Sequence, residues 1–153
     1  MKTNGFLGID IGTQGLSVIF TDTELKILAS GEGTYDMVSG LNSGCYEQQP
    51  CDWETALKDA MTDLRKKISS MQIDMEVLAI GISGQMHGEV LTEEEGEPVG
   101  PARLWCDGRN EAEGDELTEH LGTKCPKRMT AVRWLWTIRN QPEKAARVSH
   151  MTT

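Results

Sequence analysis

Two runs of alternating apolar residues at the start of the chain predict a β-hairpin over residues 5–22. The apolar positions in the two runs are Leu7, Ile9, Ile11, Leu16, Val18 and Phe20. In the first strand, the period of two places the apolar side chains on one face and Gly8 and Asp10 on the other. The turn at residues 12–15 has glycine at both ends, so it exposes backbone N–H groups with few side chains in the way.

The pattern that follows predicts a third strand, a long helix and a fourth strand. The third strand is expected within residues 25–38. Apolar residues then recur at helical spacing from Trp53 to about Ser69, with Asp52 as the N-cap. The nearly continuous apolar run at residues 76–83 is typical of a central strand covered on both faces. This order of elements predicts an α/β domain with a mixed sheet and flanking helices.

The second half of the chain has shorter and more polar segments. The expected elements are strands at residues 89–92 and 102–106, and helices at residues 110–121, from residue 130, and at residues 142–147. Gly122 is a typical C-terminal cap, Thr130 is able to cap the next helix, and Pro142 suits a first helical position. The run of acidic residues at 93–98 is expected to be a solvated turn.

The composition is that of a globular domain and disfavours several classes of partner. A length of 153 residues suffices for one domain with a core, and a formal net charge of -9 argues against nucleic acid or an anionic membrane as partner. No apolar run approaches the length of a membrane span, and the chain starts without a basic-then-apolar export signal. The four cysteines contain no CxxC pair and no nearby histidine at metal spacing, so we expect no zinc site. They could form two disulfides, but without an export signal we expect reduced thiols in a cytoplasm.

Asp10 is a carboxylate near the end of an apolar strand, which is costly unless it is paired, hydrated or bound to a cation. One interpretation makes it a simple acid next to a turn. In the other, N–H groups of the turn face a phosphate while Asp10 holds Mg²⁺ through water. The motifs GxxxxGK[ST] and GxGxxG are absent, so a phosphate site here would be of another type.

Three consecutive side chains follow the predicted strand at residues 76–83, where open α/β sheets place their ligands. Gln85 and His87 offer hydrogen-bond donors and acceptors that suit hydroxyl groups, and Met86 offers an adaptable apolar wall. A lone histidine is more often a satisfied structural residue, and that alternative stays open for His87.

Trp105 and Asp107 lie at the end of the strand predicted at residues 102–106 and add an aromatic face and a carboxylate. With the preceding cluster, they make up the set of groups expected around a polyhydroxylated ligand. The plainer alternative places Trp105 in the core and pairs Asp107 with Arg109 at the surface.

Ordered blocks covering most of the chain resemble the FGGY family of carbohydrate kinases. The blocks are residues 8–15, 47–50 with Trp53, 81–88, 104–109 and 130–136. The third block is similar to the xylulokinase-type version. The fourth block matches the one that follows it in xylulokinases, although Cys106 stands where they usually carry asparagine. The resemblance implies the ribonuclease-H-like fold shared with actin and heat-shock chaperone ATPases. It identifies residues 1–153 as a partial N-terminal domain, without the C-terminal nucleotide domain.

The resemblance also implies ATP and Mg²⁺ as cofactors, with Asp10 coordinating Mg²⁺–ATP through water. The residues expected against the nucleotide phosphates are Gly12, Thr13, Gln14 and Gly15. The candidate sugar-binding residues are Gln85, Met86, His87, Trp105 and Asp107. The family's general-base aspartate and its adenosine-binding glycines belong to later segments than those present here.

The implied reaction is transfer of the γ-phosphoryl group of ATP to a hydroxyl of a ketopentose or polyol such as xylulose. Erythritol and ribulose are alternative substrates, whereas glycerol is disfavoured because glycerol kinases carry Arg-Glu in place of Met86-His87. A non-catalytic truncated gene product or binding module is the alternative of another class. We expect the chain alone to be inactive, and a homodimer of the full-length enzyme is the partner that the resemblance allows.

Overall fold

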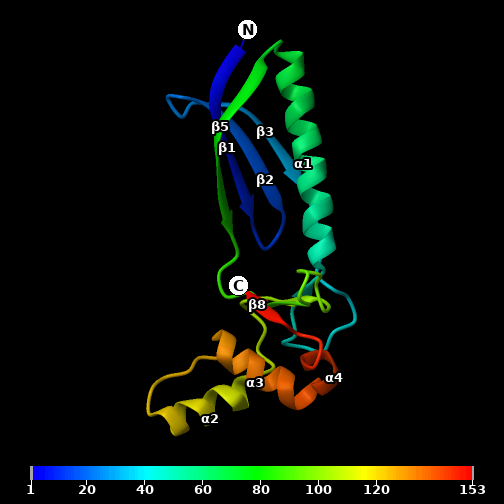
Figure 1. The fold of residues 1–153 in the computed structure, drawn as a ribbon, viewed down its shortest axis with the longest axis vertical. Coiled ribbons are helices and arrows are strands. Elements are labelled where there is room, and N and C mark those ends of the chain that lie inside the picture. The colour runs from blue at the N-terminus through cyan, green and yellow to red at the C-terminus, as the bar shows by residue number, and fades with distance from the viewer. Residues whose placement is uncertain (1, 153) are drawn as a thin grey trace. The chain divides into compact units, whose positions relative to one another are not determined.

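The computed structural model describes residues 2–152, which form two compact units (Figure 1). The first unit takes the chain up to Asp36 and then Cys51–Gly84, and the second takes Met37–Pro50 and the chain from Gln85 onward. Within residues 2–152, no helix combines the length and the apolar character that a membrane span requires.

The first unit is built on a four-stranded mixed sheet with the order β3-β2-β1-β5. Its strands are β1 (Lys2–Ile11), β2 (Leu16–Asp22), β3 (Ile27–Gly33) and β5 (Asp74–Gly84). β2 pairs antiparallel with both β1 and β3, whereas β5 pairs parallel to β1. These pairings confirm the predicted hairpin, third strand and mixed sheet, although β3 is shorter than residues 25–38.

Helix α1 (Pro50–Ser70) lies along one face of this sheet and buries it (Figure 1). The buried core residues of the strands and the helix include Leu7, Leu16, Val18, Phe20, Ala56, Ala60, Leu64 and Ile68. Ile9 and Ile11 are partly buried against the same core. The strand period of two and the helix period of 3.6 therefore selected the faces that pack together.

The long helix begins three residues earlier than predicted. It starts at Pro50, and Asp52 lies inside its first turn rather than at the N-cap. Proline suits this place because its fixed φ is helical and a first-turn N–H has no partner within the helix. The Asp52 carboxylate still lies near the positive end of the helix dipole.

Two glycines of β3 allow α1 to come close to the sheet. A Cβ at Gly31 would lie 2.0 Å from the carbonyl oxygen of Ala60, and one at Gly33 would lie 2.2 Å from that of Ala56. No side chain fits at these distances, so the strand contacts the helix backbone directly.

The prediction of a central strand at residues 76–83 is wrong for this chain. β5 lies at the edge of the sheet formed by residues 2–152, where Leu78, Ile80 and Ile82 are 52%, 58% and 71% exposed. A continuous apolar run is typical of a strand that is covered on both faces of its sheet. Among the described residues, β5 pairs only with β1, and its apolar side chains from residue 78 onward stay in contact with solvent.

The second unit combines two small antiparallel sheets, β4-β7 and β6-β8, with three helices. Its elements are β4 (Glu47–Gln48), β6 (Val90–Thr92), β7 (Ala102–Arg103), α2 (Glu111–Leu121), α3 (Thr130–Asn140), α4 (Pro142–Ala145) and β8 (His150–Thr152). The strands β4 and β8 were not predicted, because strands of two or three residues are too short to show an alternation.

The helix boundaries in this unit are partly as predicted. Gly122 caps α2 in the left-handed conformation, with φ of 63°. Pro142 begins α4, which ends at Ala145 rather than continuing to residue 147. The predicted cap of α3 is wrong, since Thr130 is its first residue and Met129 occupies the N-cap without a side-chain hydrogen bond.

Candidate functional site

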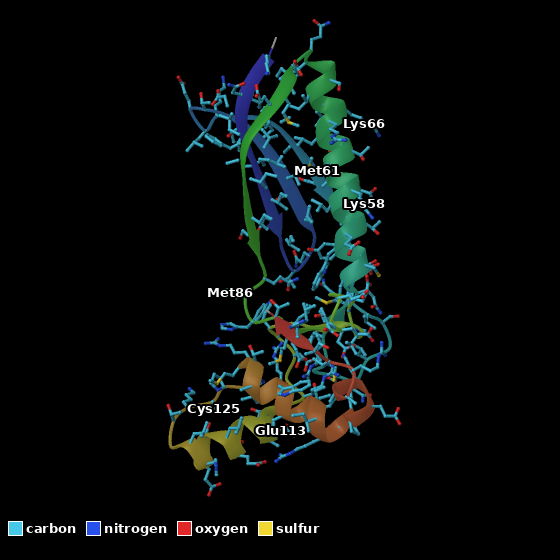
Figure 2. All side chains as sticks on the ribbon, in the orientation of Figure 1. Lys58, Met61, Lys66, Met86, Glu113 and Cys125 are labelled. Atoms are coloured by element: carbon cyan, nitrogen blue, oxygen red, sulfur yellow. The ribbon has the colours of Figure 1, made fainter. Side chains whose placement is uncertain are left out.

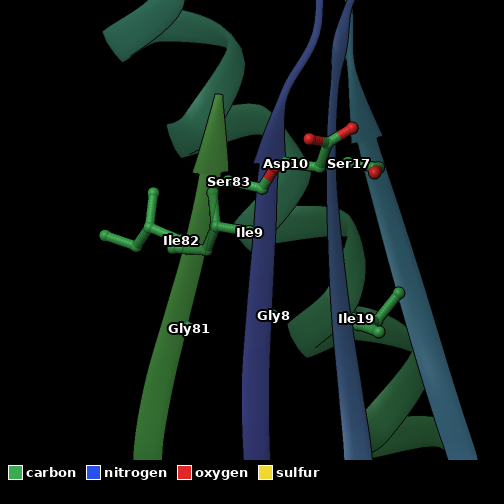
Figure 3. A pocket seen from close by; sticks show the side chains of 8 residues that line it. All are labelled: Gly8, Ile9, Asp10, Ser17, Ile19, Gly81, Ile82 and Ser83. Atoms are coloured by element: carbon green, nitrogen blue, oxygen red, sulfur yellow. The ribbon is translucent and has the colours of Figure 1, made fainter. Parts of the chain in front are cut away.

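Asp10 lies exposed on the face of the first unit's sheet that is opposite its buried core. Its register partners are Ser17 on β2 and Ser83 on β5, so hydroxyl-bearing residues flank the carboxylate on both neighbouring strands. Figure 3 shows the hollow of about 340 Å³ to which these side chains contribute. The lining residues are Gly8, Ile9, Asp10, Ser17, Ile19, Gly81, Ile82 and Ser83. The carboxylate is thus open to water or to a ligand.

Two glycines leave the strand backbone beside Asp10 uncovered by side chains. Gly8 and Gly81 are register partners on β1 and β5. A Cβ at Gly8 would lie 3.0 Å from Cγ1 of Ile19, whereas a Cβ at Gly81 would meet nothing within 4 Å. A ligand in the hollow is therefore able to come close to the strand backbone.

The turn at residues 12–15 is fixed by its own backbone and by a tyrosine from another segment. The Gly12 N–H donates to the Gly15 carbonyl oxygen at 2.9 Å. The buried Tyr35 hydroxyl lies 2.5 Å from the Gly12 carbonyl oxygen and 3.0 Å from that of Gly15, and its one proton is shared between them. Sequence analysis missed Tyr35 because a contact across twenty residues leaves no local signal.

The pKa of Tyr35 is raised above its ordinary value of 10.0, first by burial and then by the negative charge of Asp10. The phenol is therefore protonated over the neutral range and available as a donor to the turn. The hydroxyl that binds the turn at residues 12–15 therefore also interacts with the negative charge of Asp10.

The Tyr35→Phe substitution removes the hydroxyl that joins the two carbonyl groups of the turn. We expect the free energy of unfolding to fall by about 1 kcal/mol at neutral pH, the usual cost of one lost hydrogen bond. Because the folded-state pKa of Tyr35 is raised, its contribution is fully present below the unfolded pKa and is lost as the pH rises through the folded-state pKa. Urea unfolding at neutral and strongly alkaline pH measures both effects.

Tyr46→Phe is the matched control, because its side chain is exposed and forms no hydroxyl hydrogen bond within the described residues. The difference in the free energy of unfolding between wild type and the Tyr35 variant should become smaller at alkaline pH. An equal loss in both variants would contradict the role assigned to the Tyr35 hydroxyl.

Met86 and His87 form an exposed turn in the second unit, directly after the half-buried Gln85. Met86 is exposed, as Figure 2 shows, and the Gln85 side-chain amide donates to the buried Gln48 side chain at 3.0 Å. His87 has a left-handed backbone with φ of 57°. That conformation costs a non-glycine residue about 1 kcal/mol, and such outliers cluster at functional sites. The turn is thus held in one shape while it presents Met86 and His87 to solvent.

Trp105 and Asp107 have opposite environments. Trp105 is 50% exposed, so the alternative that places it in the core is wrong. Asp107 is buried, and its carboxylate accepts the Tyr46 N–H at 2.8 Å and the Arg109 guanidinium at 2.7 Å. The pair of Asp107 and Arg109 is therefore buried rather than at the surface, and in this structure it holds the loop that carries Trp105.

Arg109 connects this loop to β4. Its guanidinium forms a second ion pair with Glu47 at 2.8 Å and lies 5.3 Å from the ring centre of Trp136. Burial lowers the pKa of Arg109, but its hydrogen bond with Asp107 and the nearby negative charges more than offset this and hold the pKa above its ordinary value.

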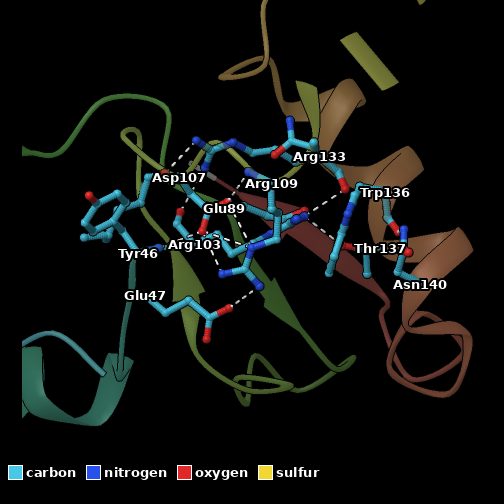
Figure 4. A network of polar contacts seen from close by, with 12 residues as sticks. Tyr46, Glu47, Glu89, Arg103, Asp107, Arg109, Arg133, Trp136, Thr137 and Asn140 are labelled. Carbon is cyan, nitrogen blue, oxygen red and sulfur yellow. Dashed lines mark hydrogen bonds and ion pairs between the residues drawn. The ribbon is translucent and has the colours of Figure 1, made fainter. Parts of the chain in front are cut away.

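A buried network of charged groups surrounds the main chain at residues 103–104 (Figure 4). Glu89 and Arg103 form an ion pair at 2.5 Å, and both side chains are almost completely buried. Arg133 donates to the carbonyl oxygens of Arg103 at 2.9 Å and Leu104 at 2.6 Å. This network fixes the main chain immediately before Trp105.

The two buried arginines of the network also act on each other. The pKa of Arg133 is lowered, first by burial and then by the positive charge of Arg103. Arg103 donates in turn to the Arg133 carbonyl oxygen and to the Thr137 hydroxyl, both at 2.8 Å, and its guanidinium lies 4.8 Å from the Trp136 ring centre. Sequence analysis missed these residues, although an arginine beside Val132 on the buried face of α3 is an unusual core residue.

Residues 2–152 contain no group of three or more His, Cys, Asp or Glu side chains that could hold a metal ion. The hollow beside Asp10 offers one carboxylate, with Ser17 and Ser83 adjacent. Mg²⁺ is commonly held in this way, by one or two carboxylates with waters and substrate phosphates as its other ligands, so the residues present fit this ion.

Comparison with known proteins points to one family. A family model described as the N-terminal domain of the FGGY family of carbohydrate kinases matches residues 6–153. The chain is 33% identical to a xylulose kinase of Haemophilus influenzae and 32% identical to one of Lactococcus lactis, over 94% and 93% of its length. It spans only 31% and 29% of the length of these curated relatives.

Solved structures give the same result. A xyloylose kinase from Brucella ovis matches 97% of this chain and 31% of its own, with a TM-score of 0.86 and 30% identity. A glycerol kinase from Plasmodium falciparum, solved with ADP, matches 95% of this chain and 31% of its own, with a TM-score of 0.83 and 28% identity.

Proposed function

Because the chain belongs to the FGGY family of carbohydrate kinases, we propose that it is the N-terminal part of an ATP-dependent kinase for a ketopentose or polyol such as xylulose. The family and the actin-like ATPase fold are as predicted from the sequence, and the substrate is the proposal. The observation that supports the proposal best is the exposed Asp10, beside a hollow and a glycine-bracketed turn held by Tyr35.

On the phosphate side of this proposal, Asp10 would hold a hydrated Mg²⁺ ion, which would supply positive charge beside the ATP phosphates. The turn at residues 12–15 would lie against those phosphates. Tyr35 keeps the turn in one shape, and Gly8 and Gly81 leave room above the backbone. The chain contributes position and charge here, which is what phosphoryl transfer requires of a protein.

On the sugar side, Met86 and His87 form one wall, next to Gln85, whose side-chain amide donates to Gln48. The exposed ring of Trp105 provides the aromatic face. Asp107 acts as a positioning residue for Trp105, since its carboxylate oxygens are already bound by Tyr46 and Arg109. This differs from a direct contact between Asp107 and the sugar.

The remainder of the site is proposed to come from chain outside these 153 residues. The matched relatives are about three times as long, since the chain covers 31% of the first of them. The exposed apolar side chains of β5 support this, because an open apolar edge strand is normally paired or covered. We therefore propose that chain outside these 153 residues supplies the general base and the adenosine site. We also propose that the 153-residue chain alone does not phosphorylate a sugar.

A coupled ADP-release assay tests the proposal with xylulose, ribulose, erythritol, xylitol and glycerol as acceptors. The full-length protein should release ADP with a ketopentose or polyol and much less with glycerol, whereas the 153-residue chain should give only background. Absence of sugar-dependent release by the full-length protein would favour the non-catalytic alternative. Turnover by the short chain would contradict the proposed division of the site.

A further inference from the structure

A second hollow, of about 660 Å³, lies beside Trp105 in the second unit, and basic residues line much of it. The lining residues are Trp105, Cys106, Lys124, Pro126, Lys127 and Arg128. The three basic residues all belong to the loop between α2 and α3. In a chain with a formal net charge of -9, a hollow lined by three cations and no acid is a local reversal of the charge.

The charges of this loop are not neutralised by the part of the chain that the structure describes. None of the ion pairs between residues 2 and 152 includes Lys124, Lys127 or Arg128. Other cations of the same unit, such as Arg109 and Arg139, are paired with carboxylates. The loop therefore keeps its charge available for a ligand.

The loop is anchored to α2 and does not depend on its basic side chains for its shape. The buried Asn110 amide donates to the Lys127 carbonyl oxygen, and the Cys125 N–H donates to the Thr118 hydroxyl at 2.9 Å. Gly114 lets the loop lie against the helix, since a Cβ there would come within 2.9 Å of the Cys125 carbonyl oxygen. The three cations thus project from a fixed backbone.

One of the cations reaches the loop that carries Trp105. A Cβ added at Gly108 would lie 3.2 Å from Nζ of Lys127, so the ammonium group lies over this glycine. Gly108 is itself held, because its N–H donates to the Gly44 carbonyl oxygen at 2.9 Å. The ammonium of Lys127 and the exposed indole of Trp105 therefore face the same hollow.

We propose that this hollow binds the anionic end of an open-chain polyol, so that the preferred acceptor carries a carboxylate, as an aldonate does. The inference rests on the proposed function, because Trp105 is a wall of the proposed sugar site. The indole would pack against the carbon chain, while Lys124, Lys127 and Arg128 would donate charge-assisted hydrogen bonds to the carboxylate.

Isothermal titration of the full-length protein with D-xylonate and with xylitol tests this inference. The two ligands share a five-carbon hydroxylated chain and differ at one end, by a carboxylate. We expect xylonate to bind at least about tenfold more tightly, as charge-assisted hydrogen bonds would give. Added salt should weaken xylonate binding and leave xylitol binding nearly unchanged.

The double substitution Lys127→Gln and Arg128→Gln should abolish the preference for xylonate. The matched control is Lys66→Gln, which removes a charge from an exposed lysine of α1 in the other unit (Figure 2). Inorganic phosphate, titrated separately, distinguishes a site for any anion from a site for an anionic polyol.

Equal binding of the two ligands, or a preference that survives the double substitution, would overturn this inference. Phosphate binding as tight as xylonate binding would also overturn it, because the polyol chain would then contribute nothing. In each case the proposed function would stand if xylulose or xylitol still drove ADP release. Absence of ADP release with every acceptor, xylonate included, would instead overturn the proposed function.

Discussion

Replacing Asp10 with asparagine in the full-length protein should lower sugar-dependent ADP release by about a hundredfold to a thousandfold, the usual effect of removing one electrostatic stabiliser of a transition state. Asparagine keeps the shape but lacks the charge that would hold a hydrated Mg²⁺ beside the phosphates. Sugar binding and thermal stability should change little, since Asp10 is exposed. Steady-state kinetics, sugar titration and thermal melting measure the three effects.

Asp59→Asn is the matched control, because Asp59 is an exposed carboxylate of α1 that forms no ion pair within residues 2–152. It should leave turnover unchanged. Unchanged turnover in the Asp10 variant would return Asp10 to the plainer interpretation of an acid beside a turn.

The Glu89→Gln substitution should destabilise the second unit by about 3 kcal/mol or more, because it leaves a buried charge without its partner. Glu89 is the ion-pair partner of Arg103, and Arg133 lies beside Arg103 in the same buried network. Without the carboxylate, two guanidinium groups would remain close together with little compensation. Urea unfolding followed by tryptophan fluorescence measures the loss.

Glu94→Gln is the control for this prediction, because Glu94 lies in the exposed acidic turn. A double variant, Glu89→Gln with Arg103→Met, should recover part of the lost stability, since it removes the uncompensated charge as well. If Glu89→Gln lowered the free energy of unfolding by less than about 1 kcal/mol, the ion pair would behave like an exposed one. The buried network would then not be what fixes the loop that carries Trp105.

Much of the first unit follows from local patterns. Val18 and Phe20 repeat the alternation of β1, and Ala60 and Leu64 recur on one face of α1. Several residues therefore indicate the same buried face of each element. The start of α1 at Pro50 and the N-cap of α3 at Met129 were missed because single capping residues carry little information. The exposure of β5 was missed because its apolar run indicates covering neighbours that the described residues do not provide.

The sequence names two clusters as candidate sites, Asp10 with its turn and His87 with Trp105, and their roles stay predictions. The two clusters fall in different units of the structure. The burial of Asp107 depends on Tyr46 and Arg109, which are brought to it by the fold. Such long-range contacts leave no periodicity that sequence analysis could detect.

The basic loop between α2 and α3 was also missed. Lys124, Lys127 and Arg128 are ordinary surface residues in the sequence, spread through a segment without a motif. They become a candidate site only because the fold places all three on one hollow with Trp105.

The most direct test of the central claim is the fate of labelled phosphate when the full-length protein acts on ATP labelled at its γ-phosphate. The label should appear on a hydroxyl of the sugar or polyol, in step with ADP release, and Asp10→Asn should lower both by about a hundredfold to a thousandfold. Label that appears only as inorganic phosphate, or that stays on ATP with every acceptor, would contradict a carbohydrate kinase.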